Sequence, residues 1–263
     1  MDLGLKGRVA IIAAASKGLG RAVAAELARE GAQVAICARS TAHLEQAASS
    51  IREATGREVF WQALDVTDAP RVQQFVDAVE RRYGRVDICV TNAGGPPAKT
   101  FLEISLEEWN AAVALNLLST VYFAREVLPR MRKNRWGRLV TITSVSVKQP
   151  IDGLLLSNSI RAAVAGLART LANEFGADGI TVNNVCPGYT LTERLEELGD
   201  ALAQRAGVPR EKIFERWTSQ VPLGRLGKPE EFAALVTFLL SERASYINGA
   251  SIAVDGGYVR SLL

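Results

Sequence analysis

The sequence predicts an α/β fold in which helices cover both faces of a single parallel sheet. Seven short runs rich in Val and Ile are apolar throughout, which is typical of strands buried on both sides. Segments with helical periodicity alternate with these runs, and this alternation favours a doubly wound sheet with right-handed crossovers. The expected strands are residues 8–14, 33–38, 58–64, 86–92, 137–143, 180–186 and 250–256.

Glycines mark the ends of several expected helices. The clearest helical patterns cover residues 20–31, 68–84, 161–176 and 228–242. Gly31, Gly84 and Gly176 close three of them. Glycine readily takes the left-handed backbone conformation that ends a helix, so we expect the helices to stop there.

The chain is expected to form one domain, residues 1–263, because it has neither a low-complexity linker nor a repeat. One long excursion, residues 188–227, departs from the strand–helix alternation and carries two further helical patterns. Segments of this size above the carboxyl edge of a sheet commonly close over a substrate, so we expect a lid. An additional packing layer is the alternative.

The composition excludes several classes of protein. A net charge of +3, with 48% hydrophobic and 22% charged residues, is ordinary for a globular protein and argues against nucleic acid as the main partner. His43 is the only histidine and sits in a polar segment, where we expect it to be exposed. A Ser-His-Asp hydrolase or a multi-histidine metal site therefore has little to work with.

The cysteines and the N-terminal segment point to the cytoplasm. Cys37, Cys89 and Cys186 each end an apolar run, so we expect buried free thiols in a reducing compartment. The first residues lack the cleavage region of a signal peptide. No apolar stretch approaches the ~20 residues that span a bilayer, so we expect no membrane partner.

A glycine-rich segment, AAASKGLG, follows the first expected strand. Gly18 and Gly20 open a helix there, so backbone amides can approach a pyrophosphate at the positive end of the helix. Close helix–sheet packing would also use glycines, but the position within the first strand–helix–strand unit predicts a Rossmann-type dinucleotide site.

The end of the second strand bears on the choice of cofactor. A carboxylate there would bind the ribose hydroxyls and repel a 2′-phosphate, but the strand ends in Ala38, followed by Arg39. Arg39 and Lys17 can pair with the phosphate, which favours NADP over NAD. The alternative is that both are solvated surface cations.

Ordered motifs along the chain resemble those of the short-chain dehydrogenase/reductase family, over nearly its whole length. After the glycine loop come LDVTD (64–68), TNAG (91–94), Asn116, Ser144, NNVCPGYTLT (183–192) and VDGGY (254–258). Within the family the chain looks most like 3-oxoacyl-acyl-carrier-protein reductases and related sugar or polyol dehydrogenases. The resemblance also implies a homotetramer, and small residues of the expected helix 161–176 would permit close helix–helix approach unless they are buried within the monomer.

The resemblance implies a set of cofactor-binding residues, together with one departure from the family pattern. Ala13 and Ala14 replace the family's Thr-Gly, and Ala14 is disfavoured wherever φ must be positive. The implied cofactor contacts are Ala14, Ser16, Lys17, Gly18, Leu19, Gly20, Arg39, Asp65, Val66, Asn92, Ala93, Gly94, Arg161, Pro187, Gly188, Thr190 and Thr192.

The catalytic pair of the family is missing. Family members carry a Tyr and a Lys four residues apart on one helical face, and here Ser157 and Arg161 occupy those positions. In the family the Lys lowers the pKa of the phenol, which exchanges a proton with the substrate oxygen, while a Ser orients the carbonyl and an Asn supports a water chain. Ser144 and Asn116 match those last two. None of the five tyrosines is followed by Lys four residues later.

Other side chains are candidates for the missing proton donor. The hydroxyl of Ser157 is too short and too weakly acidic to replace the phenol, whereas Arg161 keeps a charge that could hold ribose or an acidic substrate. Lys148 lies on a loop four residues after Ser144, and a lysine with a lowered pKa can act as an acid. Tyr189 and Asp152 are weaker candidates.

Three functions therefore remain open from the sequence. The first is an NADP-dependent oxidoreductase of carbonyls or alcohols with a reorganised proton donor, its catalytic residues being Ser144, Asn116, Ser157, Arg161 and Lys148. The second is a binding or regulatory protein that keeps the nucleotide fold without turnover. The third is another reaction on the same scaffold, such as elimination or epimerisation.

Overall fold

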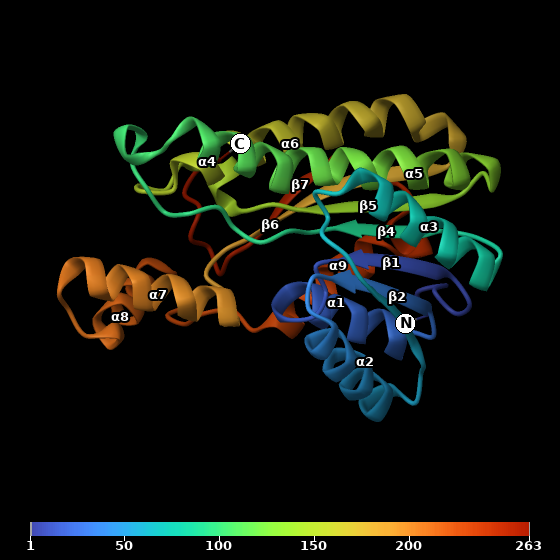
Figure 1. The fold of residues 1–263 in the computed structure, drawn as a ribbon, viewed down its shortest axis with the longest axis horizontal. Coiled ribbons are helices and arrows are strands. Elements are labelled where there is room, and N and C mark those ends of the chain that lie inside the picture. Colours follow the sequence, from blue (N-terminus) through green and yellow to red (C-terminus); the bar gives the residue numbers. More distant parts are fainter. Residues whose placement is uncertain (1, 263) are drawn as a thin grey trace.

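A computed structural model describes residues 2–262 and contains one sheet of seven parallel strands (Figure 1). The strand order is β3-β2-β1-β4-β5-β6-β7, so the direction of the crossovers reverses between β1 and β4. All seven expected strands are confirmed, as is the doubly wound parallel sheet. Their bounds are β1 Val9–Ala13, β2 Gln33–Ala38, β3 Val59–Ala63, β4 Ile88–Thr91, β5 Gly137–Ile142, β6 Ile180–Pro187 and β7 Ser251–Val254.

Helices cover both faces of the sheet in two layers (Figure 1). One layer holds α1 (Gly18–Arg29), α2 (Thr41–Thr55) and α9 (Pro229–Leu239), and Leu27, Leu44 and Phe232 are fully buried in its core. The other layer holds α3 (Ala69–Tyr83), α5 (Ser119–Lys133) and α6 (Leu155–Phe175), where Phe75 and Phe123 fill the core. Apolarity on both faces of the strands reflects these two cores.

Two helix ends show how local signals act. Gly84 takes φ +77° and ends α3 as expected. Gly176 instead keeps a right-handed conformation after α6, and the chain continues through a 3₁₀ turn to Gly179, where φ is +77°. The expected left-handed stop therefore lies three residues later, because a second glycine was available.

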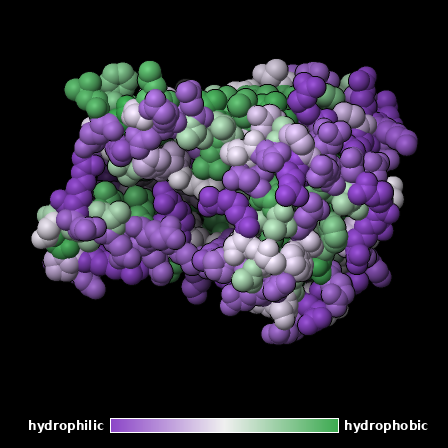
Figure 2. All heavy atoms as spheres, viewed as in Figure 1, coloured by the Kyte–Doolittle hydropathy of each residue, from purple (hydrophilic) through white to green (hydrophobic). Residues whose placement is uncertain are grey.

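The segment after β6 forms a separate helical pair, α7 (Glu193–Ala206) and α8 (Arg210–Gln220), beyond the carboxyl edge of the sheet (Figure 1). It has its own small apolar cluster, in which Leu195, Ile213 and Trp217 are buried. The surface is hollowed between this pair and the body of the molecule (Figure 2). The two expected helical patterns are confirmed, and they project rather than add a layer to the sheet.

One continuous helical stretch, Leu106–Lys133, is long and apolar enough to cross a membrane by length and composition. It consists of α4 (Leu106–Ala112), a π-helical turn η2 (Val113–Leu118) and α5. The expectation that no apolar stretch approaches the length needed to span a bilayer was therefore wrong, judged by the length and mean hydropathy of this helix. Its apolarity has a structural reason, since α5 packs against α3, β4 and β5.

Short 3₁₀ turns complete the chain: η1 Phe101–Glu103, η3 Val145–Val147, η4 Gly176–Asp178 and η5 Glu242–Ala244. The expected burial of the cysteines is confirmed, since Cys37, Cys89 and Cys186 are free thiols without exposed surface. Burial raises the pKa of the Cys37 thiol to about 12 and raises that of Cys89 as well. His43 is exposed, as expected.

Candidate active site

The candidate site forms where the carboxyl ends of four neighbouring strands meet. Ala14, Asn92, Ser144 and Gly188 follow β1, β4, β5 and β6 directly, or within two residues. Ligands of doubly wound sheets bind at this edge, next to the point where the crossover direction reverses. The sheet topology thus brings together segments that are far apart in the sequence.

The glycine loop forms a close-packed cradle. A Cβ on Gly20 would lie 2.8 Å from the carbonyl oxygen of Ala14 and 3.1 Å from Nδ2 of Asn92, so only glycine fits there. Asn92 Nδ2 donates to that same carbonyl at 3.3 Å and ties the end of β4 to the loop. Gly18 opens α1 with φ +54°. The backbone at the helix N-terminus is therefore free to approach a pyrophosphate.

Ala14 carries the conformational strain anticipated from the sequence. Its φ is +49°, in the left-handed region that glycine occupies at little cost. For an L-residue with a Cβ this conformation costs about 1–2 kcal/mol. The family's glycine has thus been replaced at a position where the backbone still takes a glycine conformation.

Two unpaired cations follow the first two strands: Arg39 comes directly after β2, and Lys17 precedes α1. Ala38 is buried, whereas Arg39 and Lys17 are exposed and take part in no ion pair within residues 2–262. Asp65 lies nearby: hydrogen bonds from the backbone and hydroxyl of Thr67 lower the pKa of its carboxyl, and Arg39 lowers it further. Val66 is buried beside it.

The opposite wall is built by the segment after β6. Thr192 caps α7, where its Oγ1 accepts from Leu195 N at 3.2 Å, and a Cβ on Gly18 would lie 3.4 Å from its Cγ2. Thr190 is buried, and its hydroxyl donates to the carbonyl of Gly188 at 3.3 Å. A Cβ on Gly188 would lie 2.6 Å from Cβ of Asp255, so glycine is required. Four further expected cofactor contacts are half-buried: Pro187, Ser16, Leu19 and Ala93.

Open space at the end of β4 completes the cradle. A Cβ on Gly94 would meet nothing within 4 Å. The close-packed glycine loop, this open space and the free cations Arg39 and Lys17 match the shape and charge of a phosphorylated dinucleotide, so the residues present fit NADP.

Asn116 lies in the π-helical turn η2, a type of distortion that is frequent at functional sites. Its Nδ2 donates to the carbonyl of Gly94 at 2.9 Å, and its own backbone carbonyl accepts from Thr120 Oγ1 at 3.1 Å. Within residues 2–262 its buried Oδ1 has no partner. Asn116 therefore holds the loop after β4 through its Nδ2, while its Oδ1 remains available to accept a hydrogen bond.

Three serines form a chain at the end of β5. Ser144 Oγ accepts from the backbone of Ser146 at 3.1 Å, and Ser146 Oγ lies 3.4 Å from Ser157 Oγ. The hydroxyl of Ser157, which the motif resemblance aligns with the family's phenol, is thus turned toward a buried neighbour. Sequence reasoning missed Ser146, although its position two residues after Ser144 was the available signal.

Arg161 follows Ser157 by one turn of α6 and is only 9% exposed. Its NH1 donates to the carbonyl oxygens of Ile142 at 3.2 Å and Thr143 at 2.9 Å. Burial and the nearby charge of Arg194 lower the pKa of Arg161 to about 10. The guanidinium still carries its charge at neutral pH.

The positive charges of Lys148 and Arg161 both affect the pKa of one buried thiol, that of Cys186. Cys186 is held by Thr143 Oγ1 at 3.5 Å and Asn184 Nδ2 at 3.3 Å. Burial raises the pKa of Cys186, while the charges of Lys148 and Arg161 oppose that rise. Both cations therefore lie close to the end of β6.

The other two donor candidates lie elsewhere. Tyr189 stacks on Trp217 with centroids 5.1 Å apart and meets Tyr258 edge-on at 5.1 Å. Burial, followed by a hydrogen bond with Tyr258, raises its pKa. Tyr189 is thus a packing residue of the helical pair α7–α8, and Asp152 is exposed on its loop. Thr91, which replaces a family asparagine, has a buried hydroxyl with no partner in residues 2–262.

Arg194 connects α7 to the loop after β4. Its NH2 donates to the carbonyls of Gly95 at 3.4 Å and Pro96 at 3.2 Å. Sequence reasoning did not single out Arg194, because helical spacing alone does not reveal which face of the segment 188–227 turns inward.

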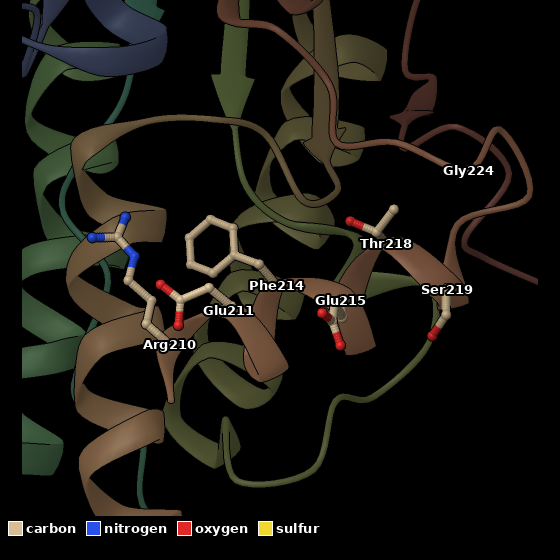
Figure 3. A pocket seen from close by; sticks show the side chains of 7 residues that line it. All are labelled: Arg210, Glu211, Phe214, Glu215, Thr218, Ser219 and Gly224. Atoms are coloured by element: carbon tan, nitrogen blue, oxygen red, sulfur yellow. The ribbon is translucent and has the colours of Figure 1, made fainter. Parts of the chain in front are cut away.

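A hollow of about 730 Å³ lies along α8 (Figure 3). It is wide open, and its lining shares no residue with the cradle or the serine chain. The lining residues are Arg210, Glu211, Phe214, Glu215, Thr218, Ser219 and Gly224.

Comparison with known proteins identifies the family. The profile described as Enoyl-(Acyl carrier protein) reductase matches residues 13–259. The 3-oxoacyl-[acyl-carrier-protein] reductase FabG of Escherichia coli is 35% identical over 255 residues, which cover 97% of this chain and 98% of that protein. The chain therefore belongs to the short-chain dehydrogenase/reductase family, as its motifs predicted.

Solved structures agree. L-Sorbose reductase from Gluconobacter frateurii, complexed with NADPH and L-sorbose, is 34% identical with a TM-score of 0.94, and the match covers 100% of both chains. An actinorhodin polyketide ketoreductase variant with NADPH is 32% identical with a TM-score of 0.93, covering 97% of this chain and 98% of the other. The Rossmann-type fold of the chain is that of these reductases.

Proposed function

We propose that this protein is an NADP-dependent reductase of carbonyl compounds in which the usual tyrosine is replaced by another proton donor. The observation that carries the proposal is the intact cradle, in which Gly20 packs against Ala14 and Asn92 while the space beside Gly94 stays open. Ser144, Asn116 and Arg161 gather at the same edge of the sheet.

Two free cations, one after β2 and one before α1, support NADP over NAD. Arg39 and Lys17 are exposed and unpaired in the described chain, and no carboxylate occupies position 38. A bidentate guanidinium suits a 2′-phosphate. NADPH is also the cofactor in the two solved reductases named above, which supports the same choice.

Lys148 is the proposed proton donor. When bound, the reduced cofactor supplies a hydride to the carbonyl carbon. The ammonium of Lys148 then gives a proton to the carbonyl oxygen, yielding an alcohol, and recovers a proton from solvent. Ser144 is in place to orient the carbonyl through its hydroxyl. Proton donation of this kind is worth about 10²–10⁴-fold in rate.

The surrounding structure supports three further parts of the proposal. The helical pair α7–α8 within residues 188–227 would serve as the substrate lid of a single domain, residues 1–263. Exposed Phe101, Leu102 and Leu106 form an apolar corner, where Figure 2 shows green atoms gathered, and such a patch suits contact with another copy in a homotetramer. The free, buried thiols support a cytoplasmic location.

The test uses purified protein, NADPH and a panel of 3-oxoacyl thioesters, keto sugars and small aldehydes. We expect NADPH to bind more tightly than NADH and its absorbance to fall with at least one substrate. Arg39→Ala should weaken NADPH binding about 10–100-fold, because a charge-assisted hydrogen bond is lost. Arg57→Ala, another exposed arginine, is the matched control, and failure to bind either nucleotide would overturn the proposal.

A second candidate, nucleotide binding without turnover, is favoured by one observation. The Ser157 hydroxyl lies against Ser146, and Tyr189 packs against Trp217 in the apolar cluster of α7–α8. Neither residue therefore supplies the phenol proton donor that the family uses. Tight NADPH binding without consumption on any substrate, in wild type and in Lys148→Met alike, would establish this function instead.

A further inference from the structure

The buried guanidinium of Arg161 has no counter-ion. It is 9% exposed and enters no ion pair in the part of the chain that the structure describes. Its hydrogen-bond acceptors are two neutral backbone carbonyls at the end of β5. Taking such a charge out of water costs several kcal/mol unless an anion accompanies it.

Part of the guanidinium remains available to a ligand. Both hydrogen bonds of Arg161 use NH1, which leaves Nε and NH2 as donors, and neither of these is sealed from solvent. A guanidinium presents these donors as a planar fork that matches the two oxygens of a carboxylate.

Two further cations act on this part of the site, of which Arg194 also pairs with Glu197 at 3.7 Å. Arg194 is close enough to lower the pKa of Arg161, and Lys148 acts with Arg161 on the neighbouring Cys186, whose own raised pKa keeps that thiol neutral at pH 7. The exposed Asp152 takes part in no ion pair within residues 2–262. The guanidinium of Arg161 is therefore a buried positive charge that no carboxylate of the described residues neutralises.

Ser157 lies on the same face of α6 as Arg161 and has a short side chain. It lies one helical turn before Arg161, and its short side chain points to Ser146 Oγ at 3.4 Å. Serine is much smaller than the phenol that the family resemblance implies at this position, so no ring occupies the helical face next to the guanidinium.

We propose that Arg161 binds a carboxylate of the substrate, so that the protein acts on oxo acids rather than on neutral ketones. This inference rests on the proposed reductase function and names its substrate class. The carboxylate would pair with Nε and NH2 of Arg161 while the ketone lies toward Ser144 and Lys148. The loss of tyrosine and the exchange of lysine for arginine would then be one coordinated change, which removes a proton donor and adds a side chain that binds the substrate carboxylate.

The experiment compares matched acids and esters with the NADPH-loaded protein. Acetoacetate is paired with methyl acetoacetate, and pyruvate with methyl pyruvate. We expect kcat/KM at least 10-fold higher for the acid of the favoured pair. Arg161→Met should abolish this preference through KM, Arg161→Lys should retain part of it, and Arg169→Met, on the exposed face of α6, should leave it unchanged.

Binding measurements separate the possible failures. NADPH affinity is titrated by fluorescence for every variant, and acid and ester binding to the NADP-loaded protein by calorimetry. Absence of NADPH binding in the wild type would overturn the proposed function itself. Equal binding of acid and ester would overturn only the carboxylate site, as would an Arg161→Lys variant that loses NADPH affinity while the acid preference is unchanged. Calorimetric preference for the acid, lost in Arg161→Met, would support the site even without turnover.

Discussion

At the scale of single residues, the site differs from its family in side chains whose neighbours explain the change. Ala14 holds a glycine conformation, and Arg161 satisfies backbone carbonyls that a shorter lysine would reach differently. Ser157 has turned to Ser146. Each of these side chains has local partners, and under the proposed function the chemistry at the centre of the site changes while the cradle is retained.

Replacing Ala14 with glycine should stabilise the protein. Ala14→Gly relieves the cost of φ +49° but adds entropy to the unfolded chain, so we expect a net gain of up to about 1 kcal/mol in the free energy of unfolding. Urea denaturation measures it. Ala13→Gly, one residue earlier in β1, should instead destabilise, and a loss in both variants would contradict the assigned strain.

Restoring the family pair should raise generic carbonyl reduction. In Ser157→Tyr with Arg161→Lys, the i, i+4 spacing places a phenol and an ammonium together, and we expect an increase of about 10²–10⁴-fold in kcat on neutral ketones. Steady-state kinetics with methyl acetoacetate checks this. An inactive double variant that folds and binds NADPH would show that the helix register is misassigned or the pocket closed.

At the scale of elements, the sequence predicted the strands well and the irregular segments poorly. The strand runs are read correctly because burial on both faces imposes a continuous apolar pattern. Helix α2 was not predicted, although Ser40 caps it by accepting from His43 N and Gly56 ends it with φ +69°. Its buried residues Leu44, Ala47 and Ile51 are too sparse to stand out.

The same limits apply to the site. The cradle could be predicted because glycine spacing and strand position are local signals. The contact of Ser146 with Ser157 and the direction of Tyr189 could not, since each depends on how α6 or the helical pair α7–α8 packs in three dimensions. The positions of Lys148 and Arg161 beside Cys186 likewise require the sheet topology that brings β5 next to β6.

The start of helix α9 predicts a pH dependence of stability. Glu231 accepts from Lys228 N at 2.8 Å and pairs with both NH groups of Arg225, which lowers its pKa from 4.5 to about 2. Because the pKa is lowered in the folded state, this stabilisation is complete above about pH 4.5 and is lost as the pH falls toward 2.

Glu231→Gln should therefore melt at a lower temperature than wild type at pH 7, and the two curves should converge as the pH falls below 4.5. Differential scanning calorimetry across this range measures the difference. Glu230→Gln, the exposed neighbour, is the control. A gap between Glu231→Gln and wild type that persisted at the lowest pH would contradict an electrostatic origin.

At the scale of the whole molecule, two faces are arranged for different tasks. The carboxyl edge of the sheet gathers the nucleotide cradle and the helical pair α7–α8. The outer face of α6 presents small exposed residues, Ala162, Ala163 and Gly166, close to no other element. A flat face of this kind suits close packing against a second copy, consistent with the proposed homotetramer.

Gly166→Arg tests this association. A Cβ on Gly166 meets nothing within 4 Å in one chain, so the monomer should fold normally, while an arginine would block close approach of a second copy. Analytical ultracentrifugation should show a tetramer for wild type and smaller species for the variant. Ala54→Arg, at the exposed end of α2, should remain tetrameric; dissociation of both variants would argue against an interface on α6.

The rates at which the three buried thiols are alkylated report how often the structure around each of them opens. Cys37 and Cys89 sit in the middle of the sheet with raised pKa values, so an alkylating reagent meets them only when the strands separate. Cys186 lies next to the last residue of β6, beside Thr143, and we expect a smaller opening to expose it. The ratio of the alkylation rates of these cysteines, measured by mass spectrometry, would distinguish local opening at the end of β6 from global unfolding.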